Sequence, residues 1–309
     1  EWAREGMVNV QVVFGPEGCG KTAWLKQSAE LLKELGFDVI YINPVEKELV
    51  AETGVTDVKT RLAEILREAA ENTWVRVAWV MVDMAREIMR AGVKRIAILA
   101  DDVFQAIGLD KAAIYVKGLL GLIEYPPKPY DVVIAVAATS EGISRREIGR
   151  HRWAYTLAMW NMMKDGFEQL YDQLSGDKPN FEEVWRLTGG NPKLLGELYK
   201  ARWNEDKVLD MIMTSKELKK FVTNLSNEER AWLREAIEDP DTLFVRERMK
   251  LLDKLVELNL VIDGVPYRKD YLWIDQPPPR KDPELGIGEY VAWQSPLHRE
   301  AVRKALSGA

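Results

Sequence analysis

The first half of the chain alternates short apolar runs with longer amphipathic stretches. Apolar runs rich in β-branched residues predict buried strands, and apolar positions at helical spacing predict helices. Strands separated by helices favour an α/β fold with a parallel sheet and right-handed crossovers. The predicted strands cover residues 8–14, 38–42, 95–100, 132–137 and 153–160, and the predicted helices cover 22–35 and 58–90, with a break near Asn72.

The pattern changes to helices after about residue 161. Asn161 is predicted to cap a helix over 162–174, and Asn180 is predicted to cap one over 181–187. Pro192 begins a further helix, because proline is tolerated in a first turn.

A third region begins near residue 215. Ser226 and Glu229 form a capping-box pattern, and residues 246–258 predict an amphipathic helix. The apolar face of that helix is predicted to carry Met249, Leu252, Leu255 and Val256. The rest is predicted as a hairpin over 261–271 with Gly264 in its turn, a loop over 276–284, a returning strand over 290–293 and a helix over 296–306. We therefore expect three domains, over residues 1–160, 161–214 and 215–309.

One motif has a specific chemical meaning. Residues 15–22 match the pattern Gly-x-x-x-x-Gly-Lys-Ser/Thr, between a predicted strand and a predicted helix. Glycines let backbone N–H groups converge on phosphates, and the next helix directs its positive N-terminus at the same anion. Lys21 is expected to reach the β- and γ-phosphates, and the Thr22 hydroxyl is expected to ligate Mg²⁺. The predicted nucleotide-binding residues of this phosphate loop are Gly15, Pro16, Glu17, Gly18, Cys19, Gly20, Lys21, Thr22 and Ala23.

The apolar run over 96–100 ends in two carboxylates, Asp101 and Asp102. The carboxyl end of a buried parallel strand opens onto the crevice where such sheets bind ligands. Asp101 is predicted to hold Mg²⁺, directly or through water, and Asp102 to orient or deprotonate an attacking water. An acidic helix cap after a strand is the alternative interpretation.

Two further catalytic candidates follow the next strand. Thr139, with Ser140, could sense the γ-phosphate and position water, although a Ser/Thr turn explains the pair equally well. Arg150 is the candidate arginine finger, acting in its own subunit or on a neighbour. A solvated basic helix face is the alternative for Arg150 and for its neighbours Arg145, Arg146 and Arg152.

Composition narrows the classes of protein. The chain has 309 residues, a net charge of -6 and one cysteine, so an intramolecular disulfide is excluded and a cytoplasmic location is expected. No apolar run is long enough to predict a membrane span. The acidic balance lends no support to a nucleic-acid partner. The many charged residues, with few His and one Cys, are typical of a thermophile protein.

The motifs in this order resemble those of an archaeal P-loop ATPase of the STAND class, related to AAA+ proteins. The resemblance rests on residues 15–22, 99–103, 139–140 and 188–192, the last of which is similar to the family's Gly-x-Pro motif. It implies a helical lid over 161–214, with the Pro192 backbone near the adenine. It also implies a C-terminal winged helix, with 246–258 as recognition helix and 260–271 as wing. Many members carry Asp-Glu where this chain has Asp101-Asp102.

The leading hypothesis is an ATP-driven switch that needs ATP or ADP and Mg²⁺ and signals to an unknown protein partner or to another copy of itself. A DNA-associated ATPase acting through the winged helix is the second hypothesis. A small-molecule kinase is a third, and a module that holds nucleotide without hydrolysis is a fourth. The chain has no Asn-Lys-x-Asp guanine motif, which favours adenine over guanine.

Overall fold

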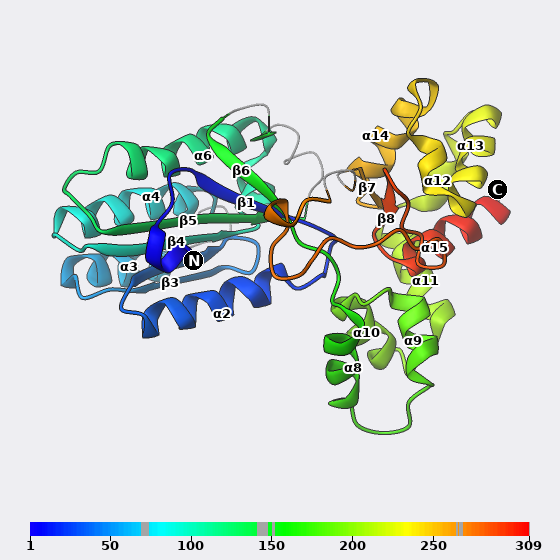
Figure 1. The fold of residues 1–309 in the computed structure, drawn as a ribbon, viewed down its shortest axis with the longest axis horizontal. Helices are drawn as coiled ribbons and strands as arrows, with labels where there is room; N and C mark the ends of the chain where they lie inside the picture. The colour runs from blue at the N-terminus through cyan, green and yellow to red at the C-terminus, as the bar shows by residue number, and fades with distance from the viewer. Residues whose placement is uncertain (69–73, 141–147, 150–151, 264, 266–267, 309) are drawn as a thin grey trace. The chain divides into compact units, whose positions relative to one another are not determined.

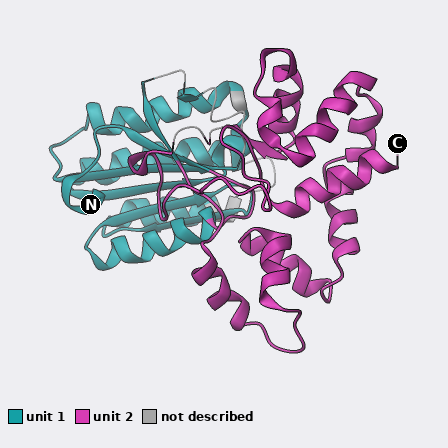
Figure 2. Cartoon of the chain, turned by 45° about the vertical axis from the view of Figure 1, so that its right-hand side comes forward, with its two compact units in different colours: residues 1–14, 21–157 teal, residues 15–20, 158–309 magenta. Residues whose placement is uncertain are grey.

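The computed structural model describes the chain except residues 69–73, 141–147, 150–151, 264, 266–267 and 309. The described residues fall into two compact units, coloured separately in Figure 2. The first unit contains residues 1–14 and 21–157, and the second contains 15–20 and 158–309. The glycine-rich part of the phosphate loop therefore belongs to the second unit, whereas Lys21 and Thr22 belong to the first.

The first unit is built on a sheet with the strand order β3-β2-β4-β5-β1-β6 in the described part of the chain (Figure 1). The strands are β1 (Val10–Phe14), β2 (Asp38–Asn43), β3 (Glu48–Glu52), β4 (Arg95–Asp101), β5 (Val132–Thr139) and β6 (Ala154–Ala158). Pairs β2–β4, β4–β5 and β5–β1 are parallel. Every residue of β5 is buried, as expected of a parallel strand covered on both faces.

The prediction of a purely parallel sheet is wrong at one edge. Strand β3 was not predicted, and it pairs antiparallel with β2, from Val39 opposite Glu52 to Asn43 opposite Glu48. The two strands are joined by a short turn in which Lys47 has a φ of 57°. A turn of this length cannot carry a crossover, so the chain returns alongside β2 in the opposite direction.

Helices cover both faces of this sheet. Figure 1 shows α4 and α6 on one face and α2 on the other. The helices that the structure bounds in the first unit are α1 (Trp2–Glu5), α2 (Lys21–Glu34), α3 (Thr56–Glu68), α4 (Trp74–Arg90), α5 (Val103–Ile107) and α6 (Leu109–Glu124). The described parts of the predicted stretch over 58–90 lie in α3 and α4, and the predicted break near Asn72 falls outside the described residues. Met81, Met84, Ile88 and Met89 form part of the buried face of α4 at helical spacing.

The second unit is mainly helical, as predicted. Its α-helices are α8 (Lys164–Asp172), α9 (Phe181–Thr188), α10 (Pro192–Lys200), α11 (Glu205–Ser215), α12 (Leu218–Thr223), α13 (Asn227–Glu238), α14 (Met249–Glu257) and α15 (Pro296–Ser307). Short 3₁₀ helices lie at η2 (Pro240–Leu243), η3 (Arg246–Arg248) and η4 (Asp270–Leu272). The Asn180 cap and the Ser226–Glu229 capping box are both confirmed.

Two helix predictions in this unit need correction. Asn161 does not cap a helix, because α8 begins after Met163 and the Asn161 side chain donates instead to the Gln294 carbonyl at 2.9 Å. The buried face of α14 contains Leu251, Leu252, Leu255 and Val256, whereas Met249 is 37% exposed. The helix starts three residues later than predicted, after η3, and this places Met249 at its exposed first position.

The predicted hairpin over 261–271 is also wrong. Strand β7 (Val261–Ile262) pairs antiparallel with β8 (Ala292–Trp293), the predicted returning strand. Residues Asp270–Leu272 form η4 instead of a second hairpin strand, and Gly264 lies outside the described residues. The partner of β7 therefore comes from about 30 residues further along the chain, a separation that local pattern cannot reveal.

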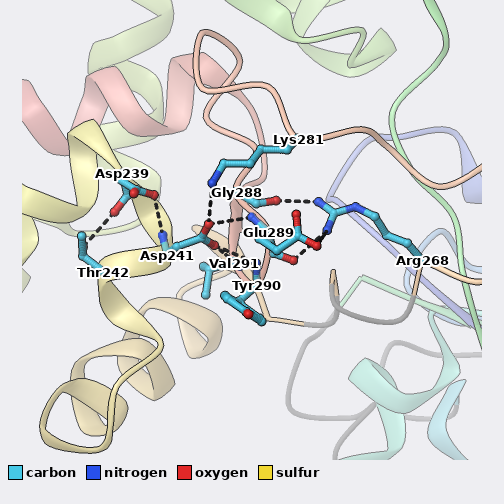
Figure 3. Close-up of polar contacts among 9 residues, drawn as sticks. All are labelled: Asp239, Asp241, Thr242, Arg268, Lys281, Gly288, Glu289, Tyr290 and Val291. Atoms are coloured by element: carbon cyan, nitrogen blue, oxygen red, sulfur yellow. Dashed lines mark hydrogen bonds and ion pairs between the residues drawn. The ribbon is translucent and has the colours of Figure 1, made fainter.

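Side chains bind both the N–H groups and the carbonyl groups of the segment that leads into β8 (Figure 3). Asp241 accepts backbone N–H groups of Glu289 and Tyr290 at 2.7 Å and of Val291 at 3.1 Å. On the other side, the Arg268 guanidinium donates to the carbonyls of Gly288 and Glu289. A carboxylate that accepts N–H groups and a guanidinium that donates to carbonyls satisfy the backbone of a segment without regular secondary structure.

In the described part of the chain, no helix has the length and apolar character that crossing a membrane requires.

Candidate active site

Three strand ends meet at one edge of the sheet. The parallel register pairs Phe14 of β1 with Thr139 of β5, and Ala138 of β5 with Asp101 of β4. Asp101 and Thr139 are both buried, each with 1% exposure. The fold thus brings two predicted site residues close to Phe14, which directly precedes the glycine loop, at the edge where α/β sheets bind ligands.

Asp101 is a buried carboxylate with neighbours from two other elements. Tyr41 Oη and Asn43 Nδ2, both on β2, each donate a hydrogen bond of 3.1 Å to Oδ2 of Asp101. The Thr22 hydroxyl at the start of α2 also hydrogen-bonds this carboxyl group, and the charge of Lys21 acts on it. Burial raises the pKa of Asp101, and these four neighbours oppose that rise. A cation beside Asp101 would therefore relieve the cost of burying its charge.

The Asp101 carboxylate and the Thr22 hydroxyl fit a magnesium site. Both are oxygen donors, which Mg²⁺ prefers, and Mg²⁺ is usually held by one or two carboxylates together with water and substrate phosphates. The described residues contain no group of three or more His, Cys, Asp or Glu that could hold a metal ion. Asp101 and Thr22 remain the predicted holders of Mg²⁺ beside a bound triphosphate.

Asp102 has a backbone conformation that few side-chain-bearing residues adopt. Its φ is 47° and its ψ is 24°, in the left-handed region that Asp and Asn tolerate best. Its N–H donates to the Ala138 carbonyl at 3.1 Å, which joins the end of β4 to the end of β5. Such conformations concentrate at functional sites. Here it turns the chain sharply from β4 into α5.

The first turn of α2 carries the lysine and threonine of the motif. Lys21 is the first residue of the helix, and its exposure is 5%. An ammonium group is buried only where negative charge or acceptors compensate it, and Asp101 is one such charge. The preceding Gly20 has a φ of 112°, which glycine adopts without a steric cost. A helix N-terminus reached in this way favours a bound anion.

The glycine loop is held by the second unit through its backbone. Asn191 Nδ2 donates to the Glu17 carbonyl at 2.9 Å, and the Glu17 N–H donates to Gln294 Oε1 at 2.9 Å. The Lys193 N–H donates to the Gly18 carbonyl at 3.3 Å. A Cβ at Gly18, which has a φ of 76°, would lie 2.4 Å from Lys193 Cβ. Only glycine at position 18 therefore lets α10 approach the loop this closely.

The Glu17 side chain is paired with two lysines. Its Oε1 lies 2.7 Å from Lys193 Nζ, and its Oε2 lies 2.8 Å from Lys216 Nζ. Burial alone would raise the pKa of Glu17, but the ammonium groups of Lys216 and Lys193 outweigh burial and lower the pKa to about 2. Glu17 is therefore ionised at neutral pH.

Asn191 connects three parts of the second unit. Its side chain is fully buried, and its Oδ1 accepts the Leu194 N–H at 3.1 Å as the cap of α10. Its Nδ2 donates to the Asn161 side chain as well as to Glu17. Pro192 is the first residue of α10, as predicted. The segment singled out for its proline thus contacts the phosphate loop through the neighbouring asparagine.

Most of the candidate arginines fall outside the part of the chain that the structure describes. Arg150, Arg145 and Arg146 lie outside the described residues, and Arg152 is exposed. The choice of Arg150 as arginine finger stays a prediction.

Several residues of this site were missed in the sequence. Asn43 gave a usable signal, because it is a polar residue that directly follows a β-branched run and is buried. Lys216 and Gln294 gave none, since they lie 199 and 277 residues from Glu17 along the chain. Only the folded chain brings these side chains to the loop.

Comparison with known proteins gives a family and distant structural similarities. No curated protein matches the chain. The Walker-type ATPase of Pyrococcus abyssi is 14% identical with a TM-score of 0.48, over 95% of this chain and 91% of that one. The ORC2 protein of Aeropyrum pernix is 11% identical with a TM-score of 0.44, over 99% of this chain and 90% of that one. A replication initiator DnaA bound to AMPPCP and single-stranded DNA is 14% identical with a TM-score of 0.38, over 82% and 83%.

The family assignment rests on a match in sequence. Residues 1–198 of the 309 match the family of ATPase domains predominantly from Archaea. This range contains the phosphate loop, both carboxylates that end β4, and the Asn191–Pro192 segment. The chain therefore belongs to this family of archaeal ATPase domains and is an ATP-hydrolysing enzyme.

Proposed function

We propose that Mg²⁺-dependent ATP hydrolysis drives a conformational switch of the STAND type in this chain. In this proposal, residues 1–160 form the nucleotide-binding domain, 161–214 a helical lid and 215–309 a winged-helix domain. The observation that carries the proposal is the attachment of the glycine loop to α10 and Gln294 through the Glu17 and Gly18 backbone. A loop that binds phosphate and is held by C-terminal helices can report its state to them.

The chemistry that we propose uses the side chains at the carboxyl edge of the sheet. Lys21 would neutralise the charge of the β- and γ-phosphates, and Thr22 with Asp101 would hold Mg²⁺. Asp102 would orient or deprotonate the attacking water, and Thr139 would sense the γ-phosphate. Bound Mg²⁺ would supply charge neutralisation of the triphosphate. The roles of these residues rest on their placement around a buried carboxylate at one strand edge.

Replacing Asp102 tests whether hydrolysis uses this edge. Asp102→Asn keeps the residue's size and its tolerance of the left-handed region but removes the charge. We expect phosphate release from Mg·ATP to fall by about a hundredfold, while ATP binding persists. Glu124→Gln, an exposed carboxylate at the end of α6, is the control and should leave the rate unchanged. Unchanged turnover in Asp102→Asn would remove Asp102 from the mechanism.

A DNA-associated ATPase is the second candidate function. Arg246, at the start of η3, and Lys250, the second residue of α14, are exposed and could contact phosphates. Against this, Arg248 is paired with Glu235 at 2.6 Å, and Lys254 is paired with Glu229 at 2.8 Å. The switch is therefore the stronger proposal, acting on a protein partner or on a second copy of this chain.

Salt dependence tests the DNA alternative. If α14 contacts DNA, affinity should fall steeply as salt concentration rises, and Arg246→Ala with Lys250→Ala should flatten that dependence. No measurable DNA affinity at low salt would exclude it.

A further inference from the structure

We propose that Glu17 is a positioning residue that couples the phosphate loop electrostatically to α10 and to the junction of α11 and α12. The inference rests on the proposed switch and gives it a physical route. Its basis is the cluster of Glu17, Lys193 and Lys216, which we name the loop latch, and which lies wholly within the second unit.

A carboxylate is an unusual side chain in a loop whose backbone binds anions. Glu17 lies one residue before Gly18 and four before Lys21, so its negative charge adds to that of any triphosphate the loop holds. The ammonium groups of Lys193 and Lys216 both face the Glu17 carboxylate and offset its negative charge. The charge at the phosphate loop therefore depends on two lysines that belong to the helical part of the second unit.

The two lysines connect the loop to different helices. Lys193 is the second residue of α10, and Lys216 directly follows α11. The residue after Lys216, Glu217, has a φ of 49° and is the N-cap of α12 (Leu218–Thr223), so Lys216 stands at a sharp corner between two helices. The Lys216 side chain is 17% exposed, which makes its attraction to Glu17 less screened than a surface ion pair. A shift of Lys216 would move the corner that joins α11 to α12.

There is space for the latch to rearrange. A cavity of about 190 Å³ is lined by Glu17, Lys193, Glu197, Lys216 and His298, together with apolar side chains of α10 and α11. Burial lowers the pKa of His298 to about 4, so this side chain is neutral at physiological pH. The charged groups that face the cavity are therefore the ammonium groups of Lys193 and Lys216 and the carboxylates of Glu17 and Glu197. A triphosphate in the loop would compete with Glu17 for both lysines and change how tightly they hold it.

If the loop latch acts in this way, removing its negative charge and removing its positive charges should change the affinity for an ATP analogue in opposite directions. Glu17→Gln removes the carboxylate that both ammonium groups contact, so it should tighten binding of a non-hydrolysable ATP analogue by about threefold to tenfold. Lys193→Gln with Lys216→Gln leaves an uncompensated carboxylate beside the loop and should weaken binding by a similar factor. Both variants should lose the coupling, because each removes one side of every latch ion pair.

Hydrogen exchange of the full chain measures the coupling directly. In the wild type, the Mg²⁺-bound analogue should change the exchange rates of amides at the end of α11 and in α12 by about tenfold. In Glu17→Gln and in the double lysine variant, the exchange rates of these amides should not respond at saturating analogue, while amides of α2 still respond. Glu217→Gln is the matched control, since it removes the adjacent, exposed Glu217–Lys220 pair and should keep the wild-type response.

The outcomes separate the latch from the switch. Lost coupling in both variants with affinity shifts of opposite sign supports the latch. A wild-type response at α11 and α12 that both variants retain would overturn the latch and leave the switch standing. A wild type without any response there would overturn both. If Glu17→Gln proves too unstable to purify, Lys193→Gln and Lys216→Gln singly decide the matter, because each should reduce the response.

Discussion

The Tyr41 hydroxyl donates a hydrogen bond of 3.1 Å to Oδ2 of Asp101, across two neighbouring parallel strands. Asn43 donates to the same oxygen from the end of the same strand. The orientation of the Asp101 carboxylate is thus fixed by β2, a strand that carries no part of the phosphate-loop motif. Changing a residue that holds a metal ligand in place typically costs about 10-fold to 100-fold in metal affinity or activity.

Replacing Tyr41 by Phe should weaken Mg²⁺ binding while leaving the fold intact. Tyr41→Phe removes one of the two donors to Oδ2 and retains the buried ring. We expect the Mg²⁺ concentration for half-maximal ATP turnover to rise by about tenfold. Tyr130→Phe is the control, because the Tyr130 hydroxyl donates to the Ile123 carbonyl. An unchanged Mg²⁺ requirement in Tyr41→Phe would show that Tyr41 does not position Asp101 for the metal.

In Asp101→Asn, the unfolding temperature should no longer depend on Mg²⁺. Because burial raises the pKa of Asp101, the protonated carboxyl group is favoured in the folded state. The stability that this group contributes is present at acid pH and is lost as the pH rises through the folded pKa. Asn cannot ionise, so at pH 8 with a chelator Asp101→Asn should unfold at a temperature no lower than the wild type.

The same unfolding experiment with Mg·ATP added tests whether Asp101 holds the metal. Mg·ATP should raise the unfolding temperature of the wild type and have little effect on Asp101→Asn. Asp131→Asn, an exposed residue just before the start of β5, is the control and should respond to Mg·ATP as the wild type does. Full stabilisation of Asp101→Asn by Mg·ATP would place the metal elsewhere.

Asp241→Asn should destabilise the second unit by about 2 kcal/mol, because hydrogen bonds to a charged acceptor are among the stronger ones. Asp241 accepts three backbone N–H groups and is the partner of Lys281 (Figure 3). Burial would raise the pKa of Asp241, but these donors outweigh it and lower the pKa. Its contribution is therefore fully present above the ordinary value of 3.8 and is lost as the pH falls through the folded pKa.

Urea unfolding followed by tryptophan fluorescence would measure this loss at neutral pH and again near pH 3. The difference between wild type and Asp241→Asn should shrink at the lower pH, because the contribution of the Asp241 charge begins to be lost once the pH falls below the ordinary pKa of 3.8. Glu284→Gln, an exposed carboxylate in the same loop, should have no comparable effect. A difference that stays constant with pH would mean that the charge of Asp241 does not stabilise this segment.

The sequence predicted the elements whose signals are local. Strand β4 could be recognised because an apolar run ends in Asp101, and the capping box of Ser226 and Glu229 because its spacing is fixed by the first turn of a helix. The phosphate loop was recognised for the same reason, since all of its residues are contiguous. Of these features, strand β4 and the phosphate loop lie in the candidate site.

The errors come from contacts between distant segments. Strand β3 was missed because Glu48–Glu52 is stabilised by its pairing with β2 and mixes charged with apolar residues. Asn161 looked like a helix cap, but it lies where Gln294 and Asn191 offer buried partners. Nothing local to position 161 indicates those partners, because they are brought there by the fold.

Lys21 gives the most direct test of ATP hydrolysis at the phosphate loop. The measurement is Mg²⁺-dependent phosphate release from ATP by the wild type, by Lys21→Ala and by Lys26→Ala. Lys26 lies on the same helix and pairs with Glu46 and Glu48, so its variant controls for loss of a lysine from α2. We predict that turnover falls by at least about a hundredfold in Lys21→Ala and is retained in Lys26→Ala. Equal turnover in the wild type and Lys21→Ala would contradict the assignment of ATP hydrolysis to this loop.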